Sequence, residues 1–204
     1  MLHKLHRTSA IIIGLFILLH LINHSMIILG AQNHIEFMDA IRVIYRNAIV
    51  ESLLILCILF QVSSGVVLVW KRRGQRTGFI EKSQVWSGLY LAFFLINHLA
   101  AVFFGRLILE LDSNIYFAIA GFYVLPFSLF FIPYYFLAVV AIFVHLASAF
   151  NWLLRNKIKN PIRKNIVFLI MFIGIGFALI LIFAFLGFFS DINIPAEYLK
   201  VYQF

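Results

Sequence analysis

Residues 9–24 read SAIIIGLFILLHLINH, and residues 83–98 read SQVWSGLYLAFFLINH. Serine, glycine, an aromatic residue and a final Leu-Ile-Asn-His fall at the same offsets in both copies. Each copy lies in an apolar stretch of about the 20 residues that a helix needs to cross a bilayer. The repeat therefore places two histidines, His24 and His98, at one depth in a membrane, where ionisable side chains are rare and usually functional.

The composition of the whole chain agrees with a membrane protein. Hydrophobic residues make up 64% of the 204 residues and charged residues only 12%, against roughly 25% charged residues in soluble domains. Backbone hydrogen bonding in lipid requires the apolar stretches to be helical. The sequence predicts an all-α integral membrane protein in which residues 1–204 form one transmembrane domain, a five-helix bundle with helices near 9–30, 47–70, 84–105, 126–154 and 165–189.

Basic residues concentrate before the first stretch and in the second and fourth connections, whereas the other connections hold most of the acidic residues. By the positive-inside rule, this predicts a cytoplasmic N-terminus and a C-terminus outside. The net charge of +8 therefore reflects topology and not nucleic acid binding. The basic residues concerned are Lys4 and Arg7; Lys71, Arg72, Arg73, Arg76 and Lys82; and Arg155, Lys157, Lys159, Arg163 and Lys164.

Two segments between the apolar stretches have a mixed pattern. Residues 35–46 have apolar side chains spaced among polar ones, as expected of a short interfacial amphipathic helix. The long run from Ile115 to Leu154 is predicted to form one span, because two spans would place the basic 155–164 loop outside. Residues 115–125 then lie at the interface or tilt the entry into that span.

The repeated histidines are candidate haem ligands. His24 and His98 each lie roughly 22 Å beyond the serine that opens their copy, on helices that run in the same direction. A haem fits between two such helices, with one neutral imidazole on each face of the iron. His20 lies four residues before His24 on nearly the same helix face. It is an alternative ligand of this outer site, a ligand of a second site, or a hydrogen-bonding residue.

A second pair of positions lies on the two antiparallel helices. Gln61 is ten residues before Lys71, and His145 is ten residues before Arg155. Both would lie roughly 15 Å from the cytoplasmic edge. This pattern predicts an inner site with His145 and either Gln61 or His20. The remaining histidines, His3, His6 and His34, are expected to be solvated.

Three short motifs resemble one family of membrane proteins. Residues 6–10, His-Arg-Thr-Ser-Ala, are similar to the His-Arg-x-Ser/Thr-Gly signature at the first helix of the cytochrome b anchors of succinate dehydrogenases and fumarate reductases. Gln61 and Gly65 are similar to that family's second-helix His followed four residues later by Gly. His20 or His24, Gln61, His98 and His145 occupy the four positions at which two-haem members carry axial histidines, so Gln61 is a departure.

The resemblance implies a function. It implies an electron-transfer subunit that holds one or two haem b groups in the bacterial cytoplasmic membrane. Flavoprotein and iron–sulfur subunits would dock on the cytoplasmic face, carry the succinate chemistry, and exchange electrons with a membrane quinone through this chain. Arg7 and Ser9 lie where the family signature approaches the quinone, and Glu51 is a carboxylate near a helix start that suits proton exchange.

Two other functions fit the same residues. The chain is a stand-alone b-type cytochrome or haem-binding protein if no soluble partner exists, a hypothesis that the Gln61 departure favours. A transporter or channel that moves protons or metal ions through intramembrane histidines is the third hypothesis, although five helices do not divide into two equal inverted halves.

Overall fold

The computed structural model describes residues 1–71, 74 and 78–203, and within them it contains helices and no strand. Five helices are long and apolar enough to cross a membrane, as predicted. They are α1 (Leu2–Ser25), α3 (Ala48–Lys71), α4 (Phe79–Leu107), α6 (Ser128–Leu153) and α7 (Asn160–Phe185).

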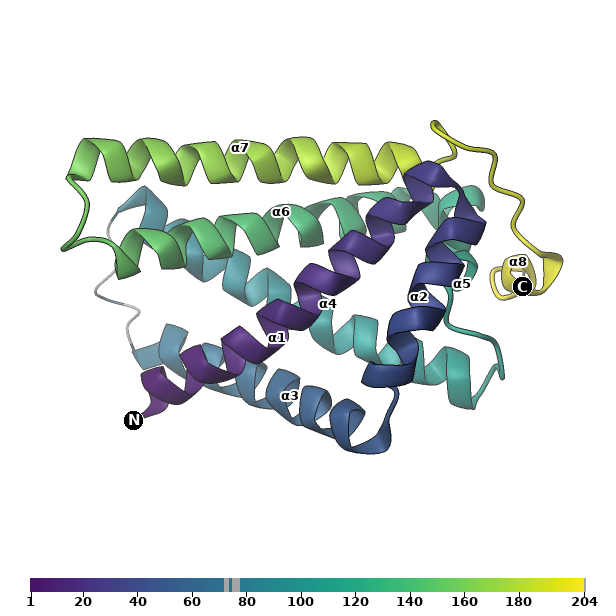
Figure 1. Cartoon of the computed structure of the whole chain (residues 1–204), viewed down its shortest axis with the longest axis horizontal. Coiled ribbons are helices and arrows are strands. Elements are labelled where there is room, and N and C mark those ends of the chain that lie inside the picture. The colour runs from purple at the N-terminus through teal and green to yellow at the C-terminus, as the bar shows by residue number, and fades with distance from the viewer. Residues whose placement is uncertain (72–73, 75–77, 204) are drawn as a thin grey trace.

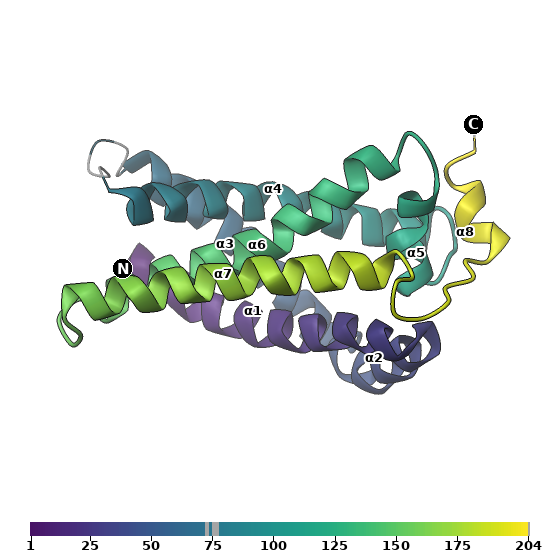
Figure 2. The same cartoon turned by 90° about the horizontal axis from the view of Figure 1, so that it is seen from above.

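The long helices alternate in direction, as Figures 1 and 2 show. Helices α1, α4 and α7 run away from the end of the bundle that holds the N-terminus, and α3 and α6 run back toward it. The two basic connections therefore lie at the same end as the N-terminus. Arg72, Arg73 and Arg76 of the first basic connection lie outside the described residues.

Short elements cover the opposite end. These are η1 (Met26–Leu29), α2 (Ala31–Tyr45), α5 (Ile115–Ile119), η2 (Ala120–Tyr123) and α8 (Ala196–Lys200). The predicted short helix at 35–46 is confirmed as part of α2. The predicted single span at 126–154 is α6, which runs from Ser128 to Leu153 and continues through Pro133.

The predicted helix ends were less accurate. Helix α1 begins at Leu2, well before residue 9, and α7 ends at Phe185, before residue 189. Apolar runs mark the part of a helix that lies in hydrocarbon, whereas a helical backbone extends past it as far as local hydrogen bonds allow. Because α1 begins this early, His6 belongs to the helix and contacts side chains of α3.

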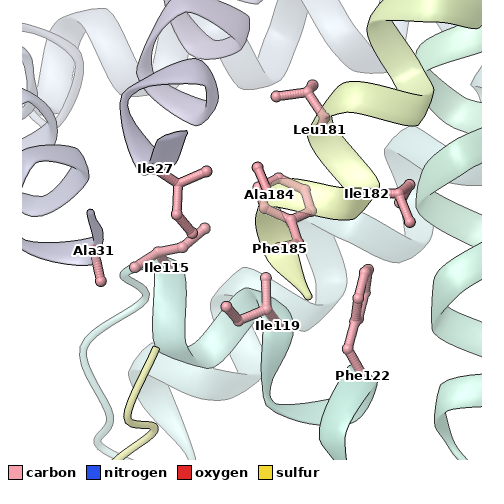
Figure 3. Close-up of a cluster of buried hydrophobic side chains, with 9 residues drawn as sticks. All are labelled: Ile27, Ala31, Ile115, Ile119, Phe122, Leu181, Ile182, Ala184 and Phe185. Carbon is pink, nitrogen blue, oxygen red and sulfur yellow. The ribbon is translucent and has the colours of Figure 1, made fainter. Parts of the chain in front are cut away.

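The largest buried cluster joins the short elements to the end of α7 (Figure 3). Side chains from η1, α2, α5 and η2 meet the last turns of α7, and Ile27 and Ile115 are fully buried. This packing holds α2 across the end of the bundle. The cluster comprises Ile27, Ala31, Ile115, Ile119, Phe122, Leu181, Ile182, Ala184 and Phe185.

The long helices do not all pack closely. Helix α6 packs against α7 and α4, and α1 packs against α3. Within the described residues, α1 and α4 make few backbone contacts with each other. The same holds for α3 and α6. These are the two pairs of helices that carry the candidate ligands.

Candidate functional site

Four histidines gather between α1, α2 and α4. His24 Nε2 lies 3.1 Å from His20 Nε2, and His24 Nδ1 lies 3.2 Å from His34 Nε2. The His20 and His98 rings meet edge-on, with their centroids 6.0 Å apart and their planes at 66°. We call these residues the four-histidine cluster. It joins two residues of α1 to one residue of α4 and one residue of α2.

The structure distinguishes the two histidines of α1. His20 contacts His98, whereas His24 lies between His20 and His34. Residues i and i+4 of a helix differ by about 40° in direction and about 6 Å in height. The rotation of α1 therefore decides which of them faces α4. The pair that the structure brings together is His20 and His98, the second of the two ligand choices that the sequence left open.

Aromatic side chains surround the cluster. Phe16 stacks on His20 at 5.7 Å, and Phe94 stacks on His98 at 5.2 Å with an interplanar angle of 12°. Tyr135 approaches His98 edge-on at 6.5 Å. A cavity of about 80 Å³ lies among these rings and is lined by all four histidines. It is smaller than a porphyrin, so a haem would require the other side chains that line the cavity to move.

His34 was expected to be solvated, and that expectation was wrong. Its side chain is only 2% exposed, and Asn23 Nδ2 donates to its Nε2 at 3.3 Å. Ala31, His34 and Met38, spaced three and four residues apart, form the buried face of α2. That helical spacing was the available signal, because it extends the amphipathic pattern of residues 35–46 back to His34.

The burial of His34 predicts a pH dependence of stability. Burial lowers the pKa of His34 to about 4 from its ordinary 6.5. The unfolded chain therefore binds more protons below pH 6.5, and folded stability is lost as the pH falls toward 4. The loss from this residue is about 2 kcal/mol at pH 5.

We expect the thermal midpoint in detergent to be lower at pH 5 than at pH 7.5, and this difference to be smaller in His34→Gln. An equal fall in His34→Gln and in the exposed-residue control His3→Gln would contradict this.

The predicted inner residues have different partners from those expected. Gln61 Oε1 accepts from Ser9 Oγ at 2.6 Å, and Gln61 Nε2 donates to His6 Nε2 at 3.1 Å. His145 Nδ1 lies 3.3 Å from Ser87 Oγ of α4. His20 belongs to the four-histidine cluster and not to this group. His6, which was expected to be solvated, instead makes two side-chain contacts with α3.

The three candidate quinone residues do not form one site. Arg7 lies over the Trp152 ring at 5.1 Å, and Ser9 is buried against Gln61, both near the N-terminal end of α1. Glu51 lies near the start of α3, at the opposite end of the bundle. There it forms an ion pair with Arg106 of α4.

A groove between α4 and α6 is a further candidate site. It has a volume of about 620 Å³ and is mostly apolar. Lys82, Ser83, Ser87 and Tyr90 line it together with Trp86 and Phe93. The Ser87 hydroxyl also contacts His145, so the Ser87 side chain lies between the groove and His145. Spacing alone did not indicate this groove, because it requires the packing of α4 against α6.

The chain matches no protein-family model, no curated protein and no solved structure. Among the described residues, no group of three or more His, Cys, Asp or Glu side chains is arranged to hold a bare metal ion. Two axial imidazoles satisfy a haem, because the porphyrin supplies the other ligands.

Proposed function

We propose that this chain is a haem-carrying electron-transfer subunit in the membrane, with His20 and His98 as the axial pair of one haem b. The observation that supports this proposal most is the contact between these two rings, which lie on α1 and α4. Imidazole nitrogens bind a metal at about 2 Å, so two imidazoles on opposite sides of one metal have centroids about 6 Å apart. The His20 and His98 centroids are 6.0 Å apart.

The surroundings of this pair support the same assignment. Haem supplies one-electron chemistry when bound. The chain supplies neutral imidazoles, stacked aromatic rings that exclude water, and helices α1 and α4 that are not closely packed. His20 would hold the haem through Nε2, the atom that lies 3.1 Å from His24 Nε2 in the structure. His24 keeps its contact with His34, which holds its ring next to the site.

A membrane quinone is the proposed electron partner. The groove between α4 and α6 suits the ring and tail of a lipid-soluble quinone, because it is apolar and open at the surface of the bundle. Ser83 and Lys82 provide donors for quinone oxygens. Ser87 also contacts His145, which connects the groove to the interior. Arg7, Ser9 and Glu51 remain alternative quinone contacts at the two ends of the bundle.

Soluble partners are proposed for the basic end of the bundle. Flavoprotein and iron–sulfur subunits would dock over the connections around residues 71–83 and 155–165, with the N-terminus cytoplasmic and the C-terminus outside. The membrane would be the bacterial cytoplasmic membrane. The charge distribution and the resemblance of residues 6–10 to the anchors of succinate dehydrogenases and fumarate reductases support this arrangement.

The test is purification from native membranes, followed by a reduced-minus-oxidised spectrum and haem quantification. We expect a low-spin b-type spectrum with at least one haem per chain, and co-purification of a flavoprotein and an iron–sulfur protein. A folded protein without haem, expressed with haem available, would overturn the proposal. Haem without any partner would leave the stand-alone cytochrome as the function.

A further inference from the structure

Two guanidinium groups share one indole ring at the basic end of the bundle. The guanidinium carbon of Arg7, on α1, lies 5.1 Å from the centroid of the Trp152 ring, and that of Arg155, just after α6, lies 5.4 Å from it. Both distances are within the range of about 6 Å over which a cation is attracted to an aromatic face. The Trp152 ring therefore holds two positive charges near each other, one from α1 and one from the connection that follows α6.

Neither of these two arginines has a carboxylate partner among the described residues. The ion pairs there join Arg42, Arg46 and Arg106 to carboxylates at the opposite end of the bundle. Like charges held close together repel each other, and an anion bound to both removes that repulsion. The pair Arg7 and Arg155 therefore has the charge of an anion-binding site to which the chain contributes no acidic side chain.

The connection that carries Arg155 is held in a fixed conformation by Arg163 of α7. Arg163 donates from Nε to Asn151 Oδ1 at 2.8 Å, and from one terminal nitrogen to the carbonyl oxygens of Arg155 at 2.8 Å and Ile158 at 3.2 Å. These hydrogen bonds tie the end of α6, the connection and the start of α7 together. The backbone of Arg155 is thus positioned by the fold, and its guanidinium is presented to the Trp152 ring.

The two arginines lie at the depth of the lipid headgroups. Arg7 is two residues before the first apolar stretch, and Arg155 directly follows the fourth. Trp152 is 41% exposed and its neighbour Leu153 is 54% exposed. Tryptophan is enriched at this depth of a membrane, where its ring meets both headgroups and hydrocarbon. A phospholipid offers a phosphate to the cations and hydrocarbon to the exposed apolar side chains, whereas the acidic surface of a soluble protein offers only the charge.

We propose that Arg7, Trp152 and Arg155 form a binding site for an anionic phospholipid. The two guanidinium groups bind its phosphate, because their planar arrangement of donors matches phosphate oxygens. The acyl chains lie along Trp152 and Leu153. The bound lipid joins the start of α1 to the end of α6, two helices that do not pack closely against each other. This site uses Arg7 for lipid and not for quinone, and it does not involve the four-histidine cluster.

The test is lipid titration of the full chain, purified in a neutral detergent and freed of lipid. Phosphatidylglycerol and phosphatidylcholine with the same acyl chains are compared by thermal midpoint and by native mass spectrometry. We expect phosphatidylglycerol to raise the midpoint and one molecule to stay bound per chain, and phosphatidylcholine to do neither. The double variant Arg7→Gln/Arg155→Gln should bind phosphatidylglycerol roughly tenfold more weakly or worse, because two contacts with the anionic headgroup are lost.

Two further double variants separate a specific site from general charge. Lys157→Gln/Lys164→Gln removes the same charge from exposed side chains at the same end and should bind phosphatidylglycerol like the wild type. Arg7→Lys/Arg155→Lys keeps the charge but loses the planar donors, and should bind more tightly than the glutamine variant and more weakly than the wild type. Equal midpoints in phosphatidylcholine show that the variants are folded.

Three results would overturn the proposed lipid site. Equal weakening in Lys157→Gln/Lys164→Gln would mean that the whole basic surface attracts lipid without a site. A midpoint shift of the same size with inorganic phosphate would assign the two arginines to a soluble anion. Unchanged phosphatidylglycerol binding in Arg7→Gln/Arg155→Gln, with loss of a co-purifying soluble subunit, would assign them to a protein partner. None of these measurements depends on haem, so they are independent of the proposed function.

Discussion

Replacing His98 with alanine is expected to remove one haem per chain. In the structure the His98 ring of α4 contacts the His20 ring edge-on, and the Phe94 ring stacks on the His98 ring. Without it, a haem between α1 and α4 has one axial ligand, and the ligand field that gives a low-spin b-type spectrum is lost. The measurement is haem per protein together with the reduced α-band in purified wild type and variant.

Asn97→Ala is the matched control for this change. Asn97 is the sequence neighbour of His98, but its side chain is exposed and donates to the Phe93 carbonyl oxygen of its own helix at 2.8 Å. The control should keep the wild-type haem content. Haem content and spectrum unchanged in His98→Ala would show that the repeated histidines are not ligands.

The same measurement distinguishes the two histidines of α1. His20→Ala should lose this haem, because His20 is the ring that contacts His98. His24→Ala should retain the haem with an altered spectrum, because it removes a neighbour and not the ligand. The reverse result would assign the iron to His24 and would mean that α1 rotates when haem binds.

Replacing Gly174 with alanine is expected to lower the stability of the bundle. A Cβ there would lie 2.3 Å from the Phe143 Cβ and 2.6 Å from its Cγ. The Phe143 Cβ is attached to the α6 backbone and cannot rotate away, so α6 and α7 must separate. Overpacking of this kind costs about 1–3 kcal/mol, or roughly 3–10 °C in thermal midpoint for a chain of this size.

Gly176 is the control on the same helix. A Cβ at Gly176 meets nothing within 4 Å, so Gly176→Ala should be neutral or slightly stabilising, since alanine has the better helix propensity. Thermal unfolding in one detergent compares the two variants directly. Equal midpoints for both would show that close α6–α7 packing at Gly174 does not contribute to stability.

The number and extent of the spans follow from the sequence because lipid imposes them. A run of apolar residues in hydrocarbon must be helical and must be about 20 residues long, whatever its neighbours are. The repeat predicted His24 opposite His98, whereas in the structure His20 is the α1 histidine that contacts His98. The ends of the helices were predicted less accurately. Residues 2–8, for example, are too polar to belong to the apolar stretch, yet they are part of α1.

The pairing of side chains depends on tertiary structure. Which of His20 and His24 faces α4 depends on the rotation of α1, which packing sets. His34 is buried only because α2 folds across the bundle end and is held there by residues more than 80 positions away, among them Ile115 and Phe185. His6 reaches Gln61 because α1 packs along α3. The sequence determined that histidines lie inside a membrane bundle, and only the packing of its helices decided which of them meet, because contacts between distant segments are not encoded in the periodicity of either one.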